Sequence, residues 1–376
     1  MAITYFDYNA STPLARECLD AVIVAMSEFA NPSSTHGLGQ IAKRRLITAR
    51  GEVAEFLGAA PQEIIFTSGG TESNHMAILG ACAAQPDKKQ IVTSAVEHPS
   101  NLLLLADLER KGYRVTKLGV DCDGNLNLSD LENAVTEETS LVSLMWANNE
   151  TGVIFPVGQA AEIAHKNGAL FHTDAVQICG KAEVNMKSTA ADFLSLSGHK
   201  MHAPKGIGVL FVRKKQSLPP VFFGHQERKM RGGTENLPGI AALGVACRIL
   251  AQGTHWSQTT QLRDYLESEI LNRVPSARVN GKNASRVNNT SNICFHGLPS
   301  EVIVDKLDQL GIHVSTGAAC TAGGNHPSHV LLAMGLGPGA ESSVRFSLGR
   351  DTSKEDVDHL LGVLPDIIDN MRGKVQ

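Results

Sequence analysis

The chain has 376 residues, of which 42% are hydrophobic and 19% charged, a composition typical of globular α/β proteins. Its formal net charge of −4 gives no global positive field that would favour nucleic acid or an anionic membrane surface. The N-terminus shows no signal-peptide pattern, and no apolar run approaches the roughly 20 residues of a membrane helix, so we expect a cytoplasmic protein.

In the first two thirds of the chain, short apolar runs alternate with helical patterns. The first helix is expected over residues 13–30, with Thr12 as its cap and Pro13 at its first position. Further helices are expected at 37–57, 74–84, 99–111, 128–135 and 156–167, and strands at 63–67, 90–94, 113–118, 140–146, 169–173, 192–196 and 207–212. We expect the last of these strands to join the sheet in the antiparallel direction. This rhythm predicts a mainly parallel sheet with helices on both faces.

From about residue 238 the pattern becomes more helical, and the chain is long enough for two domains. Helices are expected at 240–251, 256–274, 301–310, 328–334 and 354–371, with strands at 292–295 and 343–347. We therefore predict a large domain over residues 15–254 and a smaller α+β domain formed by residues 1–14 and 255–376.

Two loose glycine fingerprints and two histidine pairs carry little weight. Gly37-x-Gly39 and Gly335-x-Gly337 do not follow a strand, and no phosphate-loop motif is present, so nucleotide binding is disfavoured. The pairs His199/His202 and His326/His329 lack a third ligand. We expect solvent-exposed or loop-capping histidines there, and no metal in the resting enzyme.

Polar clusters follow four successive strands of the predicted sheet. They are Glu97-His98-Pro99, Asn148-Asn149-Glu150, Asp174-Ala175-Val176-Gln177 and Ser197-Gly198-His199-Lys200. Because parallel strands present their carboxyl ends at one edge of a sheet, these clusters predict a single converging site. A glycine-rich turn, Ser68 to Ser73, also feeds a helix. It can be an anion site or a plain capping box of Thr71 and Glu72, and the residues alone leave both open.

This chemistry matches pyridoxal 5'-phosphate (PLP), although a lone lysine after a strand is more often an ordinary surface charge. The cofactor needs an amine for its aldehyde, a carboxylate for its ring nitrogen, a planar group over the ring and donors for its phosphate. Lys200, Asp174, His98 and the turn at Thr71 supply these four in order.

Several ordered motifs make the sequence resemble the cysteine desulfurases of the NifS/IscS type, which are class V aminotransferase-like enzymes of PLP fold type I. The motifs are Thr67–Ser73, Glu97-His98, Asn148–Gly152, His172–Ala175, Ser197–Lys200, Arg231–Asn236 and Ser342–Arg350. The resemblance runs from Tyr5 to about Met371. It implies a mainly parallel, seven-stranded-type sheet in the large domain and a smaller α+β domain.

The resemblance implies a role for each matching residue. Lys200 would hold PLP as a Schiff base, Asp174 would pair with the ring nitrogen, and His98 would stack on the ring and move protons. Asn149 and Gln177 would contact the side of the ring, and Arg345 would bind the substrate carboxylate. The phosphate would be held by Gly70, Thr71, Ser197, His199 and, from the neighbouring subunit of a homodimer, Thr234.

Seven cysteines are scattered without a Cys-x-x-Cys pair, which argues against a disulfide framework and a zinc ribbon. Cys320 lies in a run of small residues that can carry a thiol to a partner, and beside a PLP site it is the favoured nucleophile. Cys122 sits in a turn and is incidental. The others have apolar or helical contexts and are expected in the core: Cys18, Cys82, Cys179, Cys247 and Cys294.

The resemblance thus implies that L-cysteine becomes L-alanine while its sulfur moves to Cys320 as a persulfide. An acceptor for iron-sulfur cluster assembly or another thiolation pathway would then receive the sulfur. The segment after Cys320, Thr321 to Pro327, departs from many relatives, as does Asn9 to Thr12, and this leaves the acceptor open. The alternatives are selenocysteine lyase, another class V PLP enzyme such as a transaminase, and a sulfur-relay protein without catalysis.

Overall fold

The computed structural model describes residues 3–216, 218–253, 256–317 and 327–373. Its largest sheet has seven strands in the order β2-β8-β7-β6-β5-β3-β4. Their bounds are Ile64–Thr67 (β2), Gly208–Val212 (β8), Phe193–Ser197 (β7), Leu170–Asp174 (β6), Thr139–Met145 (β5), Gln90–Ser94 (β3) and Arg114–Leu118 (β4). The strands from β7 to β4 are parallel, and β8 is antiparallel to both neighbours. The mainly parallel, seven-stranded sheet and the antiparallel addition are both confirmed.

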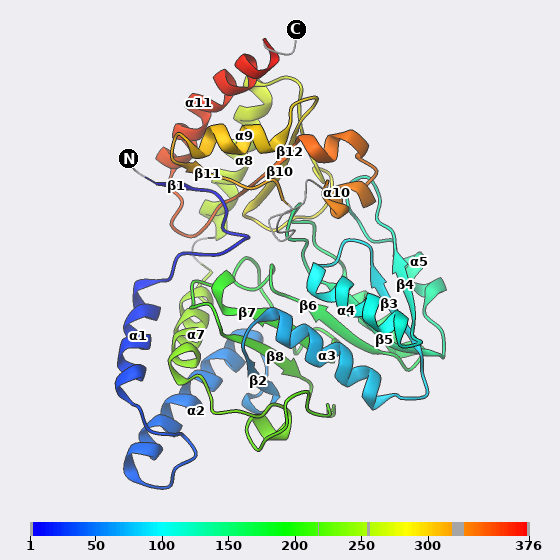
Figure 1. Ribbon diagram of the computed structural model, residues 1–376, viewed down its shortest axis with the longest axis vertical. Helices are drawn as coiled ribbons and strands as arrows, with labels where there is room; N and C mark the ends of the chain where they lie inside the picture. Colours follow the sequence, from blue (N-terminus) through cyan, green and yellow to red (C-terminus); the bar gives the residue numbers. More distant parts are fainter. Residues whose placement is uncertain (1–2, 217, 254–255, 318–326, 374–376) are drawn as a thin grey trace.

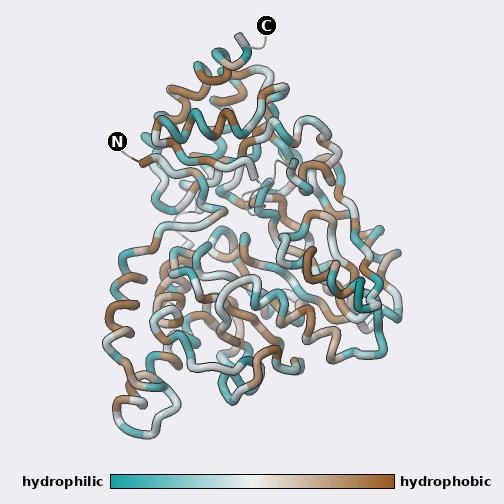
Figure 2. The backbone as a smooth tube through the Cα atoms, viewed as in Figure 1, coloured by the Kyte–Doolittle hydropathy of each residue, from teal (hydrophilic) through white to brown (hydrophobic). Residues whose placement is uncertain are grey.

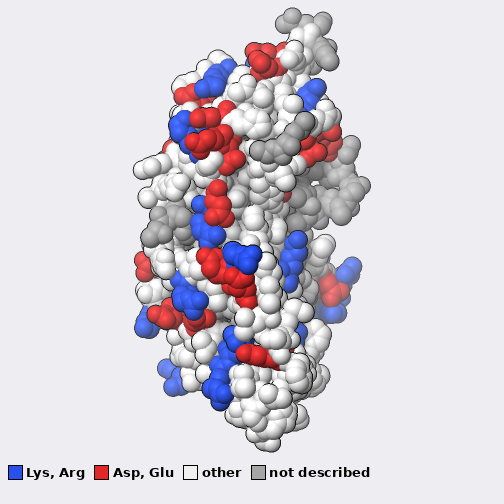
Figure 3. All heavy atoms as spheres, turned by 90° about the vertical axis from the view of Figure 1, so that its left-hand side faces the viewer, with Lys and Arg blue, Asp and Glu red and all other residues white. Residues whose placement is uncertain are grey.

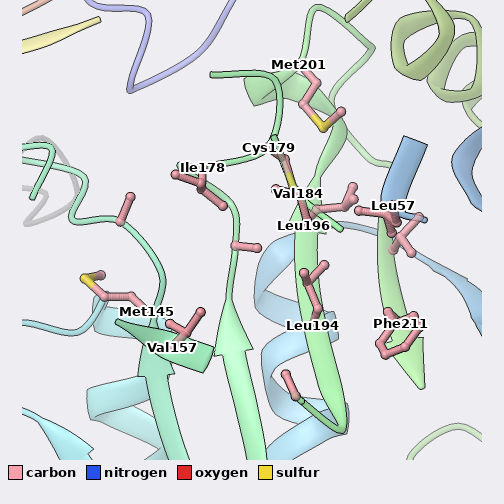
Figure 4. Packing of buried hydrophobic residues seen from close by; sticks show 14 of the residues in the cluster. Leu57, Met145, Val157, Ile178, Cys179, Val184, Leu194, Leu196, Met201 and Phe211 are labelled. Carbon is pink, nitrogen blue, oxygen red and sulfur yellow. The ribbon is translucent and has the colours of Figure 1, made fainter. Parts of the chain in front are cut away.

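Alternating residues on each strand face opposite sides of this sheet. Phe193 and Leu210 belong to the cluster under α3 (Gly70–Ala84) and α4 (Pro99–Arg110). Leu194 and Phe211 belong to the cluster on the other face, where Figure 4 shows them together with Leu196, Met201 and Cys179. That face is covered by α2 (Gly37–Leu57), α6 (Val157–Lys166) and α7 (Leu237–Leu250). A further helix, α1 (Arg16–Ser27), packs on α7, and α5 (Leu128–Ala134) packs on α6.

A third hydrophobic cluster belongs to elements in the upper part of Figure 1, near both chain ends. It joins Phe6 to residues between Leu262 and Met371, and we call the region around it the second part of the molecule. Figure 2 shows hydrophobic stretches inside this second part and inside the part built on the large sheet. Its elements are α8 (Trp256–Arg273), β9 (Ala277–Val279), β10 (Thr290–Phe295), α9 (Ser300–Asp308), β12 (Ser343–Ser347) and α11 (Lys354–Arg372). The boundaries at residues 14 and 254 stay a prediction, which this separate cluster supports.

Two very short strands tie the N-terminus to the second part. β1 (Thr4–Tyr5) pairs in parallel with β11 (Ile312–His313), and α10 (His329–Ala333) lies between β11 and β12 in the chain. Neither β1, β9 nor β11 was predicted, because two or three residues carry too little periodicity to be recognised. Across the described ranges, no helix is long and apolar enough to span a bilayer.

The expected start of the first helix is wrong by several residues. Thr12 does not cap it, because its hydroxyl donates to the His199 carbonyl and accepts from the His202 N–H, at 2.9 and 2.7 Å. The helix begins only at Arg16, after Ala15 has also bonded to His202. The segment before α1 is thus fixed against the residues that follow β7.

Gly208 lets the turn before α3 approach the sheet. A Cβ atom at this position would lie 2.6 Å from the Gly69 Cα and 2.8 Å from the Leu196 carbonyl oxygen, which no real contact allows. We therefore predict that Gly208→Ala lowers the free energy of unfolding by about 1–3 kcal/mol, the usual cost of overpacking.

Denaturant unfolding followed by circular dichroism measures this change. Gly51→Ala is the matched control, since Gly51 lies inside α2 with open space around it. Replacing a mid-helix glycine by alanine gains up to about 1 kcal/mol, so the two variants should move in opposite directions. Equal stability of Gly208→Ala and the parent would contradict the close approach.

Candidate active site

A cavity of about 340 Å³ opens at the carboxyl ends of the parallel strands. Ten of the twelve predicted site residues line it: Gly70, Thr71, His98, Asn149, Asp174, Gln177, Ser197, His199, Lys200 and Arg345. The parallel strands supply most of them, as expected for an open α/β sheet, while Arg345 comes from β12 of the second part. The structure therefore brings together residues that are far apart in the sequence.

Lys200 lies at the end of the short 3-10 turn Gly198–Lys200, directly after β7. Its amine donates to the backbone carbonyls of Asn9 and Ala10, at 2.5 and 2.7 Å. Both carbonyls belong to the segment between β1 and α1. The N-terminus thus supplies acceptors for the half-buried amine, and the sequence offered no signal for this contact.

Asp174 ends β6 and is buried, with 5% of its surface exposed. One carboxylate oxygen accepts from the Asn74 amide at 2.7 Å, and the other accepts from the Val176 N–H at 3.0 Å. These donors hold the carboxylate at the cavity wall. Asn74, on α3, was not predicted as a site residue, although it lines the same cavity.

His98 caps the N-terminus of α4 and lines the cavity. Its Nδ1 atom interacts with the Ser100 hydroxyl at 2.8 Å and accepts from the Ser100 N–H at 3.1 Å. Desolvation lowers the pKa of His98, with Asp174 raising it and Lys200 lowering it further. A neutral imidazole that already accepts through Nδ1 has Nε2 available as a donor.

The glycine-rich turn lines one end of the cavity and does not form the capping box of Thr71 and Glu72. The N-cap of α3 is Gly69, without a side-chain cap, and Glu72 instead accepts from the Ser68 N–H and pairs with Arg231. Gly70 lies so close to Val176 that a Cβ atom would be 2.8 Å from its Cγ2. Gly70 and Thr71 at this helix start line the cavity, and a helix N-terminus is a favourable place for an anion such as a phosphate.

His202 and His329, one from each of the two histidine pairs, have surroundings that the sequence did not predict. His202 is buried, with its Nδ1 atom 3.0 Å from the Pro13 carbonyl oxygen, so exposure was the wrong expectation for it. His329 begins α10 and lines the cavity, with Nε2 3.0 Å from the Glu97 carbonyl oxygen. Both histidines contact residues that are far away in the sequence, so the spacing of the pairs alone could not predict these positions.

Arg345 is 2% exposed, and its guanidinium is held on two sides. One terminal nitrogen donates to the Asn149 carbonyl oxygen at 3.0 Å, and the other pairs with Asp7 at 2.6 Å. The Nε atom has no hydrogen-bond partner among the described residues. Arg345 also lines the cavity, and a planar guanidinium of this kind is suited to a carboxylate ligand.

Two buried glutamates next to the predicted residues were missed. Burial raises the pKa of Glu97 to about 8, although Ser94 and Met145 donate to its carboxyl group. Burial likewise raises the pKa of Glu150, whose carboxyl group accepts from Ser328. Both glutamates occur inside motifs that the sequence analysis named, but their burial could not be inferred from spacing.

The two remaining predicted residues differ in what the structure describes of them. Thr234 is exposed and lies outside the cavity lining, and Cys320 lies outside the described residues. Of the other cysteines, Cys122 is exposed and the remaining five are buried, as expected. Burial raises the pKa of each buried thiol, which disfavours the reactive thiolate.

The residues present fit PLP. A buried carboxylate, an amine, a neutral imidazole and an anion-binding helix start surround one cavity, which matches the four groups that the cofactor requires. Gly70, where a Cβ atom would clash with Val176, lines this cavity together with Thr71. The coincidence of all four groups supports the cofactor more strongly than any one of them.

Comparisons with known proteins agree with this geometry. The sequence profile of the family described as Aminotransferase class-V matches residues 4–360. "Cysteine desulfurase 2" of Trichormus variabilis is 47% identical over 99% of this chain and 94% of its own length. "Cysteine desulfurase" of Cereibacter sphaeroides is 48% identical, covering 99% of this chain and 97% of the relative.

Solved structures give the same result. One of them, "NIFS-LIKE PROTEIN", superposes with a TM-score of 0.92 at 34% identity, over 98% of this chain and 100% of its own. Another, "SspA in complex with cysteine", has a TM-score of 0.81 at 35% identity, over 92% of this chain and 98% of its own.

The raised pKa of Glu97 predicts a pH dependence of stability. Because its pKa is about 8 in the folded protein and 4.5 ordinarily, the folded state keeps a proton that the unfolded state releases. The stabilisation of the folded state by this proton is complete below pH 4.5 and is lost as the pH rises through 8. We predict that Glu97→Gln gains stability relative to the parent between pH 5 and 8.

Urea unfolding at pH 5, 6.5 and 8 tests this, with Glu137→Gln, a change on the surface, as control. The difference between Glu97→Gln and the parent should grow with pH, whereas the difference for Glu137→Gln should stay flat. A constant difference for Glu97→Gln would mean that Glu97 is ionised in the folded protein.

Proposed function

Because this chain belongs to the class-V aminotransferase family and, within it, to the cysteine desulfurases, we propose that its cavity converts L-cysteine to L-alanine and transfers the sulfur to Cys320. One observation carries most of the proposal. Lys200, Asp174 and Arg345, from distant parts of the chain, line the same cavity. A sulfur-relay protein without catalysis would need none of the three.

The family implies PLP, which when bound would withdraw electrons from the substrate Cα atom. In our proposal, Lys200 is the covalent partner of its aldehyde, and Asp174, held by Asn74 and Val176, keeps the ring nitrogen protonated. His98 lies against the ring. The phosphate is held by the N-terminus of α3 and by Thr71, Ser197 and His199, which line the cavity. Desolvation lowers the pKa of His199 to about 4, so His199 would meet the phosphate as a neutral donor.

The substrate is bound by its carboxylate. Arg345 lines the cavity, while Asp7 and the Asn149 carbonyl keep its guanidinium in place. The similar structure "SspA in complex with cysteine" has that amino acid bound, which supports L-cysteine as the substrate. Lys200, once released from the cofactor, is placed to remove the Cα proton, because its amine lines the cavity.

The sulfur would then pass to Cys320. Its thiolate attacks the substrate sulfur, so that an S–S bond forms while the Cβ–S bond breaks, and the carbon skeleton takes up protons and leaves as alanine. Gly317, three residues earlier in the sequence, lines the cavity, and three residues of chain span at most about 11 Å. The raised pKa values of the five buried thiols leave Cys122 and Cys320 as candidates, and of these we propose Cys320 because Gly317 lines the cavity. The persulfide would go to an acceptor protein.

The nearest alternatives are selenocysteine lyase and a transaminase. A transaminase needs no thiol and yields a keto acid instead of alanine. The relatives named cysteine desulfurase, similar over nearly the whole chain, favour the first proposal over both.

We predict that Cys320→Ala reduces sulfur transfer at least about a hundredfold, because the attacking thiolate is lost. Holoenzyme is incubated with L-cysteine, and both alanine and protein-bound persulfide are quantified. Cys122→Ala, which removes the exposed cysteine among the described ones, is the control and should behave like the parent. A Cys320→Ala protein that supplies sulfur to an acceptor at the parental rate would disprove this assignment.

The protein is further proposed to be a homodimer that shares its sites. Thr234 is exposed and does not line the cavity of its own chain, as expected for a residue that serves the neighbouring subunit. Figure 3 views the molecule from the side of α1, where the lower end carries few charges. Large apolar side chains are exposed on α1, α2 and their connection: Leu19, Ile23, Val24, Met26, Phe29, Leu38, Ile41 and Ile47. Such a face is suited to a partner surface.

Mixed dimers test the shared site. Thr234→Glu should weaken PLP binding about tenfold or more, since a carboxylate repels the phosphate. Co-expressed Lys200→Ala and Thr234→Glu chains should form dimers with one intact site, in which Lys200 and Thr234 come from different chains. We expect parental cofactor affinity at half of the sites, measured by absorbance titration. No recovery in isolated mixed dimers would place Thr234 in its own chain's site.

A further inference from the structure

A second lysine is buried beside the cavity and has no role in the proposed reaction. Lys181 follows the turn after Asp174 and is 9% exposed. No ion pair joins it to a carboxylate within the described ranges. Burying an amine without a charged partner costs free energy. The contacts of Lys181 with neutral groups therefore need an explanation.

The amine of Lys181 donates to two side-chain amide oxygens. It lies 2.5 Å from the Oε1 atom of Gln177 and 2.7 Å from the Oδ1 atom of Asn9. The Asn9 oxygen has a second donor, the amide of Asn289 at 3.1 Å. For the Gln177 oxygen, Lys181 is the hydrogen-bond donor found among the described residues, so the orientation of the Gln177 amide depends on it.

That orientation decides which atom Gln177 presents to the cavity. With Oε1 held by Lys181, the Nε2 atom donates to the Asn9 carbonyl oxygen at 3.0 Å and keeps a second hydrogen. Gln177 lines the cavity, so this hydrogen is available to a ligand there. Rotating the amide by 180° would exchange donor and acceptor with almost no change in shape.

We propose that Lys181 is a positioning residue that fixes the amide of Gln177 so that its N–H group, and not its carbonyl, faces the bound cofactor. This inference rests on the proposed function, in which Gln177 contacts the side of the PLP ring near the phenolic oxygen. An oxygen of that kind needs a donor opposite it, and a flipped amide would offer a second acceptor.

The chemistry of lysine suits this task. An amine has only donors when protonated and still has two N–H groups when neutral, so both states hold two amide oxygens. This matters because burial lowers the pKa of Lys181 well below its ordinary value, and Lys200 and Arg345 lower it further. A small cavity of about 30 Å³, lined by both Lys181 and Lys200, has room for one water behind the two amines.

The same contacts extend to the other cofactor residues. The Asn9 carbonyl that accepts from Gln177 also accepts from Lys200, and the Asn9 amide donates to the Asn149 carbonyl oxygen at 3.1 Å. Lys181 therefore acts on a network that reaches three of the predicted site residues. Of these three residues, Lys181 contacts Gln177 directly, through a hydrogen bond. An experiment on this pair can therefore separate the effect on Gln177 from effects on the rest of the network.

The test is a double-mutant cycle with Lys181→Met, Gln177→Leu and the two combined. Two readouts are the dissociation constant of PLP from the protein and the absorption spectrum of the bound cofactor. Losing one oriented hydrogen bond should weaken PLP binding about tenfold in Lys181→Met. Its spectrum should shift in the same direction as that of Gln177→Leu, and the double variant should match Gln177→Leu. Lys187→Met, an exposed lysine in the same segment, is the control.

Two results would overturn the inference: a parental spectrum in Lys181→Met, or additive effects in the double variant. If Lys181→Met does not fold, Lys181→Gln replaces it. That variant keeps an amide donor, so a parental spectrum supports the inference and a spectrum like that of Gln177→Leu overturns it. Failure of the parent to bind PLP would instead overturn the proposed function, so the two failures are distinguishable.

Discussion

The contact between the Lys200 amine and the carbonyls of Asn9 and Ala10 is the constraint on which the site depends. A half-buried amine needs hydrogen-bond acceptors, and two of those at Lys200 are backbone carbonyls from outside the large sheet. They come from the segment between β1 and α1, and β1 itself pairs with β11 of the second part. The site therefore forms only when the N-terminus, the sheet and the second part are packed together.

Burial also determines the charge of the cavity. Arg345 keeps a carboxylate partner in Asp7, whereas Glu97 and Glu150 lie beside the cavity with pKa values that burial has raised. A raised pKa favours the uncharged form, so burial lessens the negative charge that Glu150 places near Arg345. The balance favours anionic groups, and both the phosphate of the cofactor and the carboxylate of an amino acid are anionic.

The sequence predicted those parts of the site that follow from local rules. Polar residues after Ser94, Met145, Asp174 and Ser197 had to meet, because these strands are parallel neighbours. The residues that it missed act across long separations. Asn9 contacts Lys181 and Asp7 contacts Arg345, and nothing in the spacing of these residues indicates that they meet. The late start of α1 has the same cause, since Thr12 bonds to residues after β7.

The residues that fix the cofactor do not by themselves determine the reaction, because the same set would serve a transaminase. In our proposal the segment that carries Cys320 makes the difference, and the described residues on either side of it contact the cavity. The Arg345 guanidinium donates to the Gly317 carbonyl, and Ser328 donates to Glu150, which lines the same cavity. Arg345 therefore contacts the chain just before this segment. If Arg345 binds the substrate carboxylate as proposed, one buried guanidinium contacts both the substrate and the chain that leads to the proposed nucleophile.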